Sequence, residues 1–213
     1  MGAQRLGALS GVVAVVLILA GLAVAGSTPN GTSSVAKVAA FYDKHATAQT
    51  TSGVLLSLGA LLFLVFSATL AARLRRVEGE PFGASGLCLA GAVVLVVGLG
   101  VYAGLSIAIA DVAGHVEGSA LQALSVLAND SVFVFLITIG TSAFLLGAAA
   151  SVLTTEVLPR WLGWLALLVA IVGAIPSHVL GGTLDHIGIA AFAGLGVWTL
   201  IVGVLLGVRS TAA

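Results

Sequence analysis

Six apolar stretches follow one another along the chain, and none of them contains a charged residue. A helix of about 20 apolar residues crosses the hydrocarbon core of a membrane, which is about 30 Å thick. Backbone polar groups in lipid must be satisfied within the protein, and a helix achieves this. The pattern therefore predicts an all-α polytopic membrane protein, with six transmembrane helices in one bundle as a single domain over residues 1–213. The expected spans are about 6–26, 51–72, 83–110, 132–153, 161–176 and 187–208.

The composition supports a membrane environment. Of the 213 residues, 60% are hydrophobic and 8% are charged, whereas a soluble domain has roughly 25% charged residues. Lipid must therefore solvate much of the surface. The formal net charge is zero, which argues against electrostatic binding of nucleic acid. The single cysteine, Cys88, lies in an apolar stretch and is expected to be a small buried hydrophobic side chain.

The basic residues indicate the orientation. Arg73, Arg75 and Arg76 directly follow the second apolar stretch, and short loops rich in Lys and Arg stay on the cytoplasmic side. Counting spans from this turn places every arginine inside and the two lysines, Lys37 and Lys44, outside. We therefore expect a multi-pass protein of the cell (plasma) membrane with both termini in the cytoplasm.

The first apolar stretch has a second interpretation. Ala23-Val24-Ala25 resembles the small-residue cleavage site of a signal peptide. The stretch is, however, longer than the 7–15 apolar residues typical of a signal peptide, and only Arg5 precedes it. A retained membrane anchor is favoured, and cleavage remains the alternative.

Residues 27–50 are expected outside the membrane. Asn30-Gly31 predicts a turn, and Ser33 or Ser34 can cap a short helix. The apolar positions of this helix, spaced three and four residues apart, form one stripe, which predicts an amphipathic helix on the membrane surface or folded back into its mouth. The stripe consists of Val35, Val38, Ala39, Tyr42 and Ala46.

Three further features concern the second outer segment, the fifth span and the packing of the helices. Residues 111–131 are expected to form an extracytoplasmic loop. Trp161 and Trp164 stand where an interfacial aromatic belt would lie, and Pro176 is expected to end or kink the fifth span. Two glycine pairs have a spacing that favours close packing of another helix or subunit, Gly100 with Gly104 and Gly203 with Gly207.

Four histidines, His45, His115, His178 and His186, fall on the predicted outer side. Imidazole and carboxylate groups bind zinc and similar divalent metals, which makes a metal site a hypothesis, with Asp111, Glu117 and Asp185 as acidic partners. If the third span continues as a helix, Asp111 and His115 share one face. No pair of histidines has a recognised metal-ligand spacing. Interfacial histidines that bond loops or headgroups are therefore the favoured interpretation.

Three motifs occur together in this chain: FYDKH at residues 41–45, FLVF at 63–66 leading to RLRR at 73–76, and LPRWLGWL at 158–165. This set resembles a group of small actinobacterial integral membrane proteins of unknown function. The resemblance implies a six-helix fold and a bacterial plasma membrane. It implies no activity and no functional residues.

The spans contain no ionisable side chain near their middle, whereas transporters and pumps usually carry such groups at membrane depth. A cavity for a lipid-like molecule would need no charge. We therefore expect a non-enzymatic accessory subunit, or a binder of a lipid or other hydrophobic ligand, with membrane lipids as partners and no cofactor. The alternative is an extracytoplasmic metal-binding protein or metal-dependent membrane enzyme that uses the outer histidines.

Overall fold

The computed structural model describes residues 2–29, 33–79, 83–130, 132–155, 157–175 and 185–209, and these residues form helices and no strand. The all-α class predicted from the sequence is confirmed. The helices are α1 (Ala3–Ala25), α2 (Val35–Glu78), α3 (Ala84–Val112), α4 (Gly118–Asp130), α5 (Val132–Thr155), α6 (Arg160–Gly173) and α8 (Asp185–Arg209).

Five of these helices, α1, α2, α3, α5 and α8, are long and apolar enough to cross a membrane, as expected of a polytopic membrane bundle. The apolar helix α6 is shorter, with 14 residues. At 1.5 Å per residue it spans about 21 Å, less than the roughly 30 Å of a hydrocarbon core. It ends before Pro176, as the proline predicted, because proline disfavours helical backbone at the residue preceding it. The count of six crossings therefore stays a prediction.

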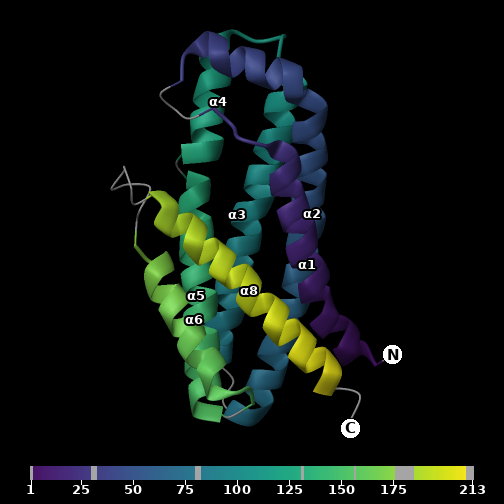
Figure 1. The fold of residues 1–213 in the computed structure, drawn as a ribbon, viewed down its shortest axis with the longest axis vertical. Coiled ribbons are helices and arrows are strands. Elements are labelled where there is room, and N and C mark those ends of the chain that lie inside the picture. Colours follow the sequence, from purple (N-terminus) through teal and green to yellow (C-terminus); the bar gives the residue numbers. More distant parts are fainter. Residues whose placement is uncertain are drawn as a thin grey trace.

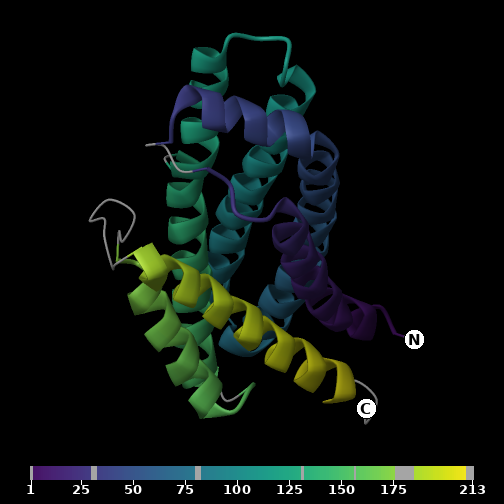
Figure 2. The ribbon, with the colours of Figure 1, turned by 45° about the horizontal axis from the view of Figure 1, so that its top comes forward.

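The helices form a bundle with two distinct ends (Figure 1). At one end lie the start of α1, the end of α2, the start of α3 and the end of α8, and we call this the arginine end because Arg73, Arg75 and Arg76 lie in the last turns of α2 there. At the other end the first turns of α2 lie across the bundle and α4 stands above α5. This second region, made of residues 35–45 and α4, is the cap. Figure 2 shows the same arrangement, with α8 crossing the bundle obliquely.

Helix α2 joins the expected amphipathic helix and the second span into one element of 44 residues. The bend between them lies at His45, whose backbone angles are φ −113° and ψ 17°. Ser34 occupies the N-cap position, but its side chain makes no capping hydrogen bond. Gly79, with φ 73°, ends the helix in the left-handed conformation that glycine adopts at least cost.

The expected loop at 111–131 was wrong, because thirteen of its residues form α4. Leu121, Leu124 and Ala128 recur at helical spacing and face the start of α2. A helix this short is marginal in isolation, so tertiary packing stabilises it. With Val38, Tyr42 and Ile109, Leu121 and Ala128 form a small hydrophobic core within the cap, separate from the core of the bundle.

Glycines bring α3 and α5 into close contact. A Cβ atom at Gly91 would collide with the backbone of Phe144, and one at Gly147 would collide with the backbone of Cys88. Gly98 and Gly140 lie seven residues from these positions and also face the opposite helix. Such direct backbone approach is typical of helix pairs in membranes, where dispersion contacts replace the hydrophobic effect as the driving force.

The two glycine pairs singled out in the sequence behave differently. Gly203 and Gly207 on α8 pack against Ala8, Val12 and Leu9 of α1, as the spacing predicted. Gly100 and Gly104 on α3 face open space, with nothing from the described residues within 4 Å of an added Cβ. The second pair therefore does not join two of the described helices.

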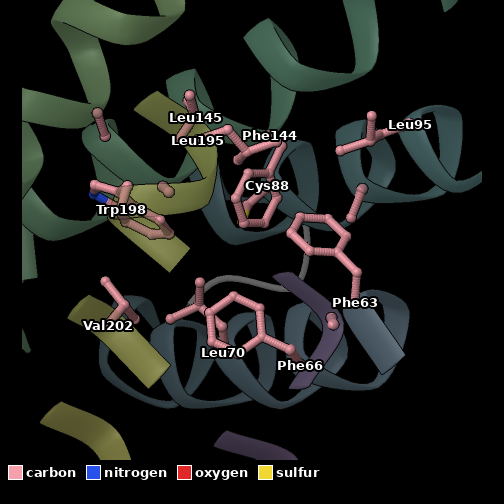
Figure 3. Close-up of a cluster of buried hydrophobic side chains, with 14 of the residues drawn as sticks. Phe63, Phe66, Leu70, Cys88, Leu95, Phe144, Leu145, Leu195, Trp198 and Val202 are labelled. Atoms are coloured by element: carbon pink, nitrogen blue, oxygen red, sulfur yellow. The ribbon is translucent and has the colours of Figure 1, made fainter. Parts of the chain in front are cut away.

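The main core lies between the helices, and Figure 3 shows part of it. The rings of Phe63, Phe144 and Trp198 meet there from α2, α5 and α8. Their centroids lie 5.2 Å apart for Phe63 and Phe144, and 5.8 Å apart for Phe144 and Trp198. The Trp198 Nε1 donates a 2.9 Å hydrogen bond to the carbonyl of Leu162, which connects α8 to the first turn of α6.

Candidate functional site

His45 lies at the bend of α2, where its ring is occupied by local contacts. Its Nδ1 lies 2.8 Å from the carbonyl oxygen of Phe41, and its ring stacks on that of Phe41 with centroids 4.6 Å apart. Because a carbonyl oxygen only accepts hydrogen bonds, Nδ1 carries the proton in this contact. The FYDKH segment thus forms a local aromatic arrangement in which Phe41 also meets Tyr42 edge to face.

His115 lies exposed in the turn between α3 and α4, together with the exposed Glu117. Helix α3 ends at Val112, and Gly114 has φ +81°. The condition under which Asp111 and His115 would share a helical face, continuation of the third span as a helix, is therefore not met. The reason is that Ala113 leaves helical backbone, with ψ 130°, before the next turn of helix can form.

The other proposed ligands are only partly described. His178 lies outside the described residues, and Asp185 and His186 begin α8 with side chains that are also outside them. Within the described part of the chain, no three His, Cys, Asp or Glu side chains gather in a way that could hold a metal ion. Because two of the four histidines lie outside this test, the metal site stays a prediction.

A polar network that sequence reasoning missed holds the cap together. The Asn129 Nδ2 donates to the Tyr42 hydroxyl at 3.2 Å and to the Ser125 carbonyl at 2.9 Å. Thr28, between α1 and α2, donates to the Asn129 Oδ1 at 3.3 Å, and the hydroxyls of Tyr42 and Ser125 lie 3.3 Å apart. Each polar side chain here bonds another part of the cap, so the network serves structure.

The main candidate for a binding site is a cavity of about 290 Å³ among α1, α2, α3 and α8. Apart from Thr199, the described residues that line it are apolar or glycine, and none of them is ionisable. The lining residues are Val15, Ile18, Leu19 and Leu22 of α1, Phe63 of α2, Leu95 and Leu99 of α3, and Phe192, Ala193, Leu195, Gly196, Val197, Thr199 and Leu200 of α8.

The local sequence explains why the space exists. The glycines at 203 and 207 hold α8 tightly against α1 near the arginine end, and α8 runs obliquely away from that contact (Figure 1). Where the helices separate, α8 presents Ala193 and Gly196. A Cβ added at Gly196 would meet only Val15 Cγ1, at 3.6 Å, so these small residues leave the space unfilled.

One polar group stands at the wall of this cavity. Thr199 is fully buried, and its hydroxyl makes no hydrogen bond within the described part of the chain. Thr51, Thr69 and Thr154 behave otherwise, since each donates to the carbonyl four residues earlier, whereas the buried Thr141 is unpaired like Thr199 in the described part of the chain. Buried hydroxyls are normally paired, so Thr199 is a donor without a partner next to an apolar space.

Sequence reasoning allowed for an uncharged hydrophobic cavity but could not place it. The lining residues come from four helices, and nothing in their identity separates them from other apolar residues. The small residues Ala193 and Gly196 indicate the cavity only weakly, because other small residues on these helices, such as Gly91 and Gly147, are in close contact with a neighbouring helix. Comparison of the chain with models of known protein families, with curated proteins and with solved structures found no match to any of them.

Proposed function

We propose that this protein binds a hydrophobic molecule, the hydrocarbon chain of a lipid or a lipid-like compound, in the cavity among α1, α2, α3 and α8. The observation that carries the proposal is the cavity itself, about 290 Å³ with apolar walls. The space is open on one side, where Leu19 and Val197 are exposed. An apolar molecule can therefore enter it directly from the hydrocarbon of a membrane.

The size and chemistry of the space favour hydrocarbon over water. A cavity of about 150 Å³ lined by Leu, Ile and Phe stays dry and holds benzene, and ligand pockets begin at about 300 Å³. The walls here offer Phe63, Leu95 and Leu99 on one side and α1 on the other. Water would find too few hydrogen-bonding partners on such walls.

The position of the cavity also supports a membrane-derived ligand. Its lining residues lie inside the stretches of α1, α2, α3 and α8 that are long and apolar enough to span a membrane. A hydrocarbon chain at that depth needs no aqueous route to reach the site. The lining residues carry no ionisable group that could serve acid–base chemistry, which favours binding over catalysis.

Thr199 supplies a point of polarity within this site. The Thr199 hydroxyl has essentially no accessible surface in the ligand-free protein. A ligand that carries an oxygen acceptor, such as an ester, a ketone or a hydroxyl, would accept a hydrogen bond from it after a side-chain movement at the wall. Pockets of this type commonly combine apolar walls with a small number of polar groups that fix orientation. We therefore expect a ligand with one polar oxygen within an otherwise hydrocarbon segment.

We place this activity in a bacterial cell membrane with both termini in the cytoplasm. The excess of arginine at one end of the bundle supports this orientation, because basic loops remain on the cytoplasmic side. We also propose that the chain is one of the small actinobacterial membrane proteins that it resembles. The motifs that carry the resemblance are FYDKH in the cap, RLRR at the end of α2, and PRWLGW at the start of α6.

Native mass spectrometry of the protein released from mild detergent tests the proposal. We expect the wild type to retain one hydrophobic molecule and the Gly196→Leu variant to lose it, because the new side chain extends into the cavity. Gly86→Leu is the matched control, since a Cβ at Gly86 meets nothing within 4 Å and this position does not line the cavity.

A spectroscopic measurement complements the first. In a Trp161→Phe, Trp164→Phe background, Trp198 is the remaining tryptophan and lies between the lining residues Val197 and Thr199. A brominated fatty acid should quench its fluorescence, and Gly196→Leu should weaken the apparent affinity about tenfold, or 1.4 kcal/mol. Equal quenching in wild type and Gly196→Leu, with no retained molecule in either, would refute the proposed function.

A further inference from the structure

Two arginines from different helices lie at the arginine end, close to one another in the fold. Arg5 lies in the first turn of α1, and Arg73 lies in the last turns of α2. Arg73 Nη2 lies 3.5 Å from the carbonyl oxygen of Gln4, the residue before Arg5. This weak contact places the Arg73 guanidinium beside the first turn of α1.

Both guanidinium groups retain unused donors. The Nε atoms of Arg5 and Arg73 are buried, and neither has a hydrogen-bond partner in the described part of the chain. Arg75 and Arg76, on the same turn, are exposed. Burying a donor without a partner costs free energy, so the first pair differs from ordinary surface arginines.

The nearby carboxylate of Glu78 has other partners. Its two oxygens accept hydrogen bonds from the backbone N–H of Ser85 at 3.0 and 3.2 Å, and the Ser85 hydroxyl also donates to it, at 2.5 Å. Glu78 thereby caps the start of α3, because it accepts the Ser85 N–H in the first turn of that helix. Positive charge therefore remains in excess where α1 begins and α2 ends.

We propose that Arg5 and Arg73 bind an oxyanion of the phosphate type, presented by an anionic phospholipid headgroup. A guanidinium group offers donors in a planar fork that matches phosphate oxygens, and such charge-assisted bonds are strong. Basic pockets between transmembrane helices on the cytoplasmic side bind anionic headgroups. The site is separate from the apolar cavity, and either one can exist without the other.

The level of the site in the bundle fits a headgroup. Trp161 and Trp164, with exposed fractions of 52% and 62%, open α6 at the same end of the bundle (Figure 1). Exposed indoles are enriched at the interface between hydrocarbon and water. The phosphate groups of a lipid leaflet would therefore lie near Arg5 and Arg73, with the acyl chains alongside α1 and α2.

A charge-matched pair of double variants tests the site in the full-length protein. Arg5→Gln with Arg73→Gln removes the proposed ligands, whereas Arg75→Gln with Arg76→Gln removes the same charge from exposed positions of the same turn. Retention of phosphatidylglycerol and of phosphatidylcholine by each protein is measured by native mass spectrometry. We expect one preferentially retained phosphatidylglycerol in the wild type.

The first double variant should lose roughly 30-fold in affinity for phosphatidylglycerol, because it loses the direct charge-assisted hydrogen bonds from both side chains to the phosphate. The control should lose no more than about threefold, because its guanidinium groups lie exposed in water, where such contacts contribute little. Equal losses in both variants, or equal retention of the two lipids by the wild type, would overturn the site. If the double variant does not fold, the single Arg5→Gln variant carries the same comparison against Arg76→Gln.

A further experiment distinguishes binding of a phospholipid headgroup from binding of free phosphate. Inorganic phosphate is added to the wild type while bound phosphatidylglycerol is followed. We expect the lipid to stay bound, because its acyl chains add apolar contact that the free ion lacks. Displacement of the lipid by inorganic phosphate would overturn the assignment to a phospholipid.

Discussion

Replacing Thr199 by valine should make the ligand-free protein more stable, although the substitution removes a polar group from a transmembrane helix. The Thr199 side chain is fully buried, and its hydroxyl has no partner in the described part of the chain. Valine has nearly the same shape, and both residues are β-branched with similar helix propensity. The substitution therefore removes mainly the unpaired hydroxyl.

The size of the effect follows from the cost of burying that group. A hydroxyl buried without a hydrogen bond costs about 1–3 kcal/mol in proteins. Removing it should therefore raise the free energy of unfolding by about 1 kcal/mol or more, which corresponds to roughly 2–4 °C in Tm for a chain of this length. The assay is thermal unfolding in detergent after extraction of bound lipid.

Thr154→Val is the matched control. The Thr154 hydroxyl donates to the Ala150 carbonyl at 2.8 Å, so the same substitution removes a satisfied group and should leave stability unchanged or lower it by up to about 1 kcal/mol. In the presence of a ligand that accepts a hydrogen bond from Thr199, the Tm of Thr199→Val should instead be lower than that of wild type. The fraction of Thr199→Val protein that retains the ligand should also be smaller. A lower Tm for ligand-free Thr199→Val would refute the reasoning, since it would mean that the hydroxyl is already paired.

Three further predictions concern packing, orientation and metal. Gly91→Val should abolish folding, judged by size-exclusion chromatography in detergent, because its Cβ would overlap the backbone of α5; Gly104→Ala, which faces open space, should be neutral or stabilising by up to about 1 kcal/mol, and folded Gly91→Val would contradict the packing. A cysteine at the exposed Val77 should react with a membrane-impermeant maleimide only in opened cells, with buried Cys88 remaining unlabelled; labelling in intact cells would invert the proposed orientation. Purified protein should carry no stoichiometric zinc by elemental analysis, and zinc that is present but lost in the His115→Ala, His186→Ala double variant would instead support the metal hypothesis.

The start of α6 and the end of α2 illustrate what local sequence predicts well. Pro159 immediately precedes α6, and Gly79 follows α2 with a positive φ. Both positions follow from backbone chemistry, because proline suits the beginning of a helix and glycine its end. The positions of the long helices were predictable for a similar reason, since an uncharged apolar run in lipid must satisfy its own backbone hydrogen bonds.

Helix α4 and the turn before it show where local sequence was insufficient. Residues 111–131 contain acidic and small polar residues, and they were predicted to form a loop. Leu121 and Ala128 nevertheless find apolar partners in Val38 and Tyr42, more than eighty residues earlier. The helix therefore depends on contacts that no local window contains. The break after Val112 likewise separated Asp111 from His115.

Glycine spacing alone could not indicate which helix a pair would meet. Gly203 and Gly207 contact α1, whereas Gly100 and Gly104 have the same spacing and face outward. A repeat of four residues defines one face of a helix, but the rotation of that helix in the bundle decides what the face contacts. Gly91 and Gly147, which hold α3 against α5, became recognisable only from the backbone that they touch.

The sequence by itself predicted a lipid environment, an all-α fold and the placement of the arginines on one side of the membrane. Each of these depends on the transfer of single residues or segments between water and lipid. Only the tertiary structure decided the cavity and the arginine pair. The cavity exists because α8 diverges from α1 on the N-terminal side of Gly203. Arg73 reaches the carbonyl of Gln4, next to Arg5, because α1 and α2 pack against each other in opposite directions. Both sites combine residues from distant parts of the chain, and their chemistry arises from relative placement, which residue identity alone does not encode.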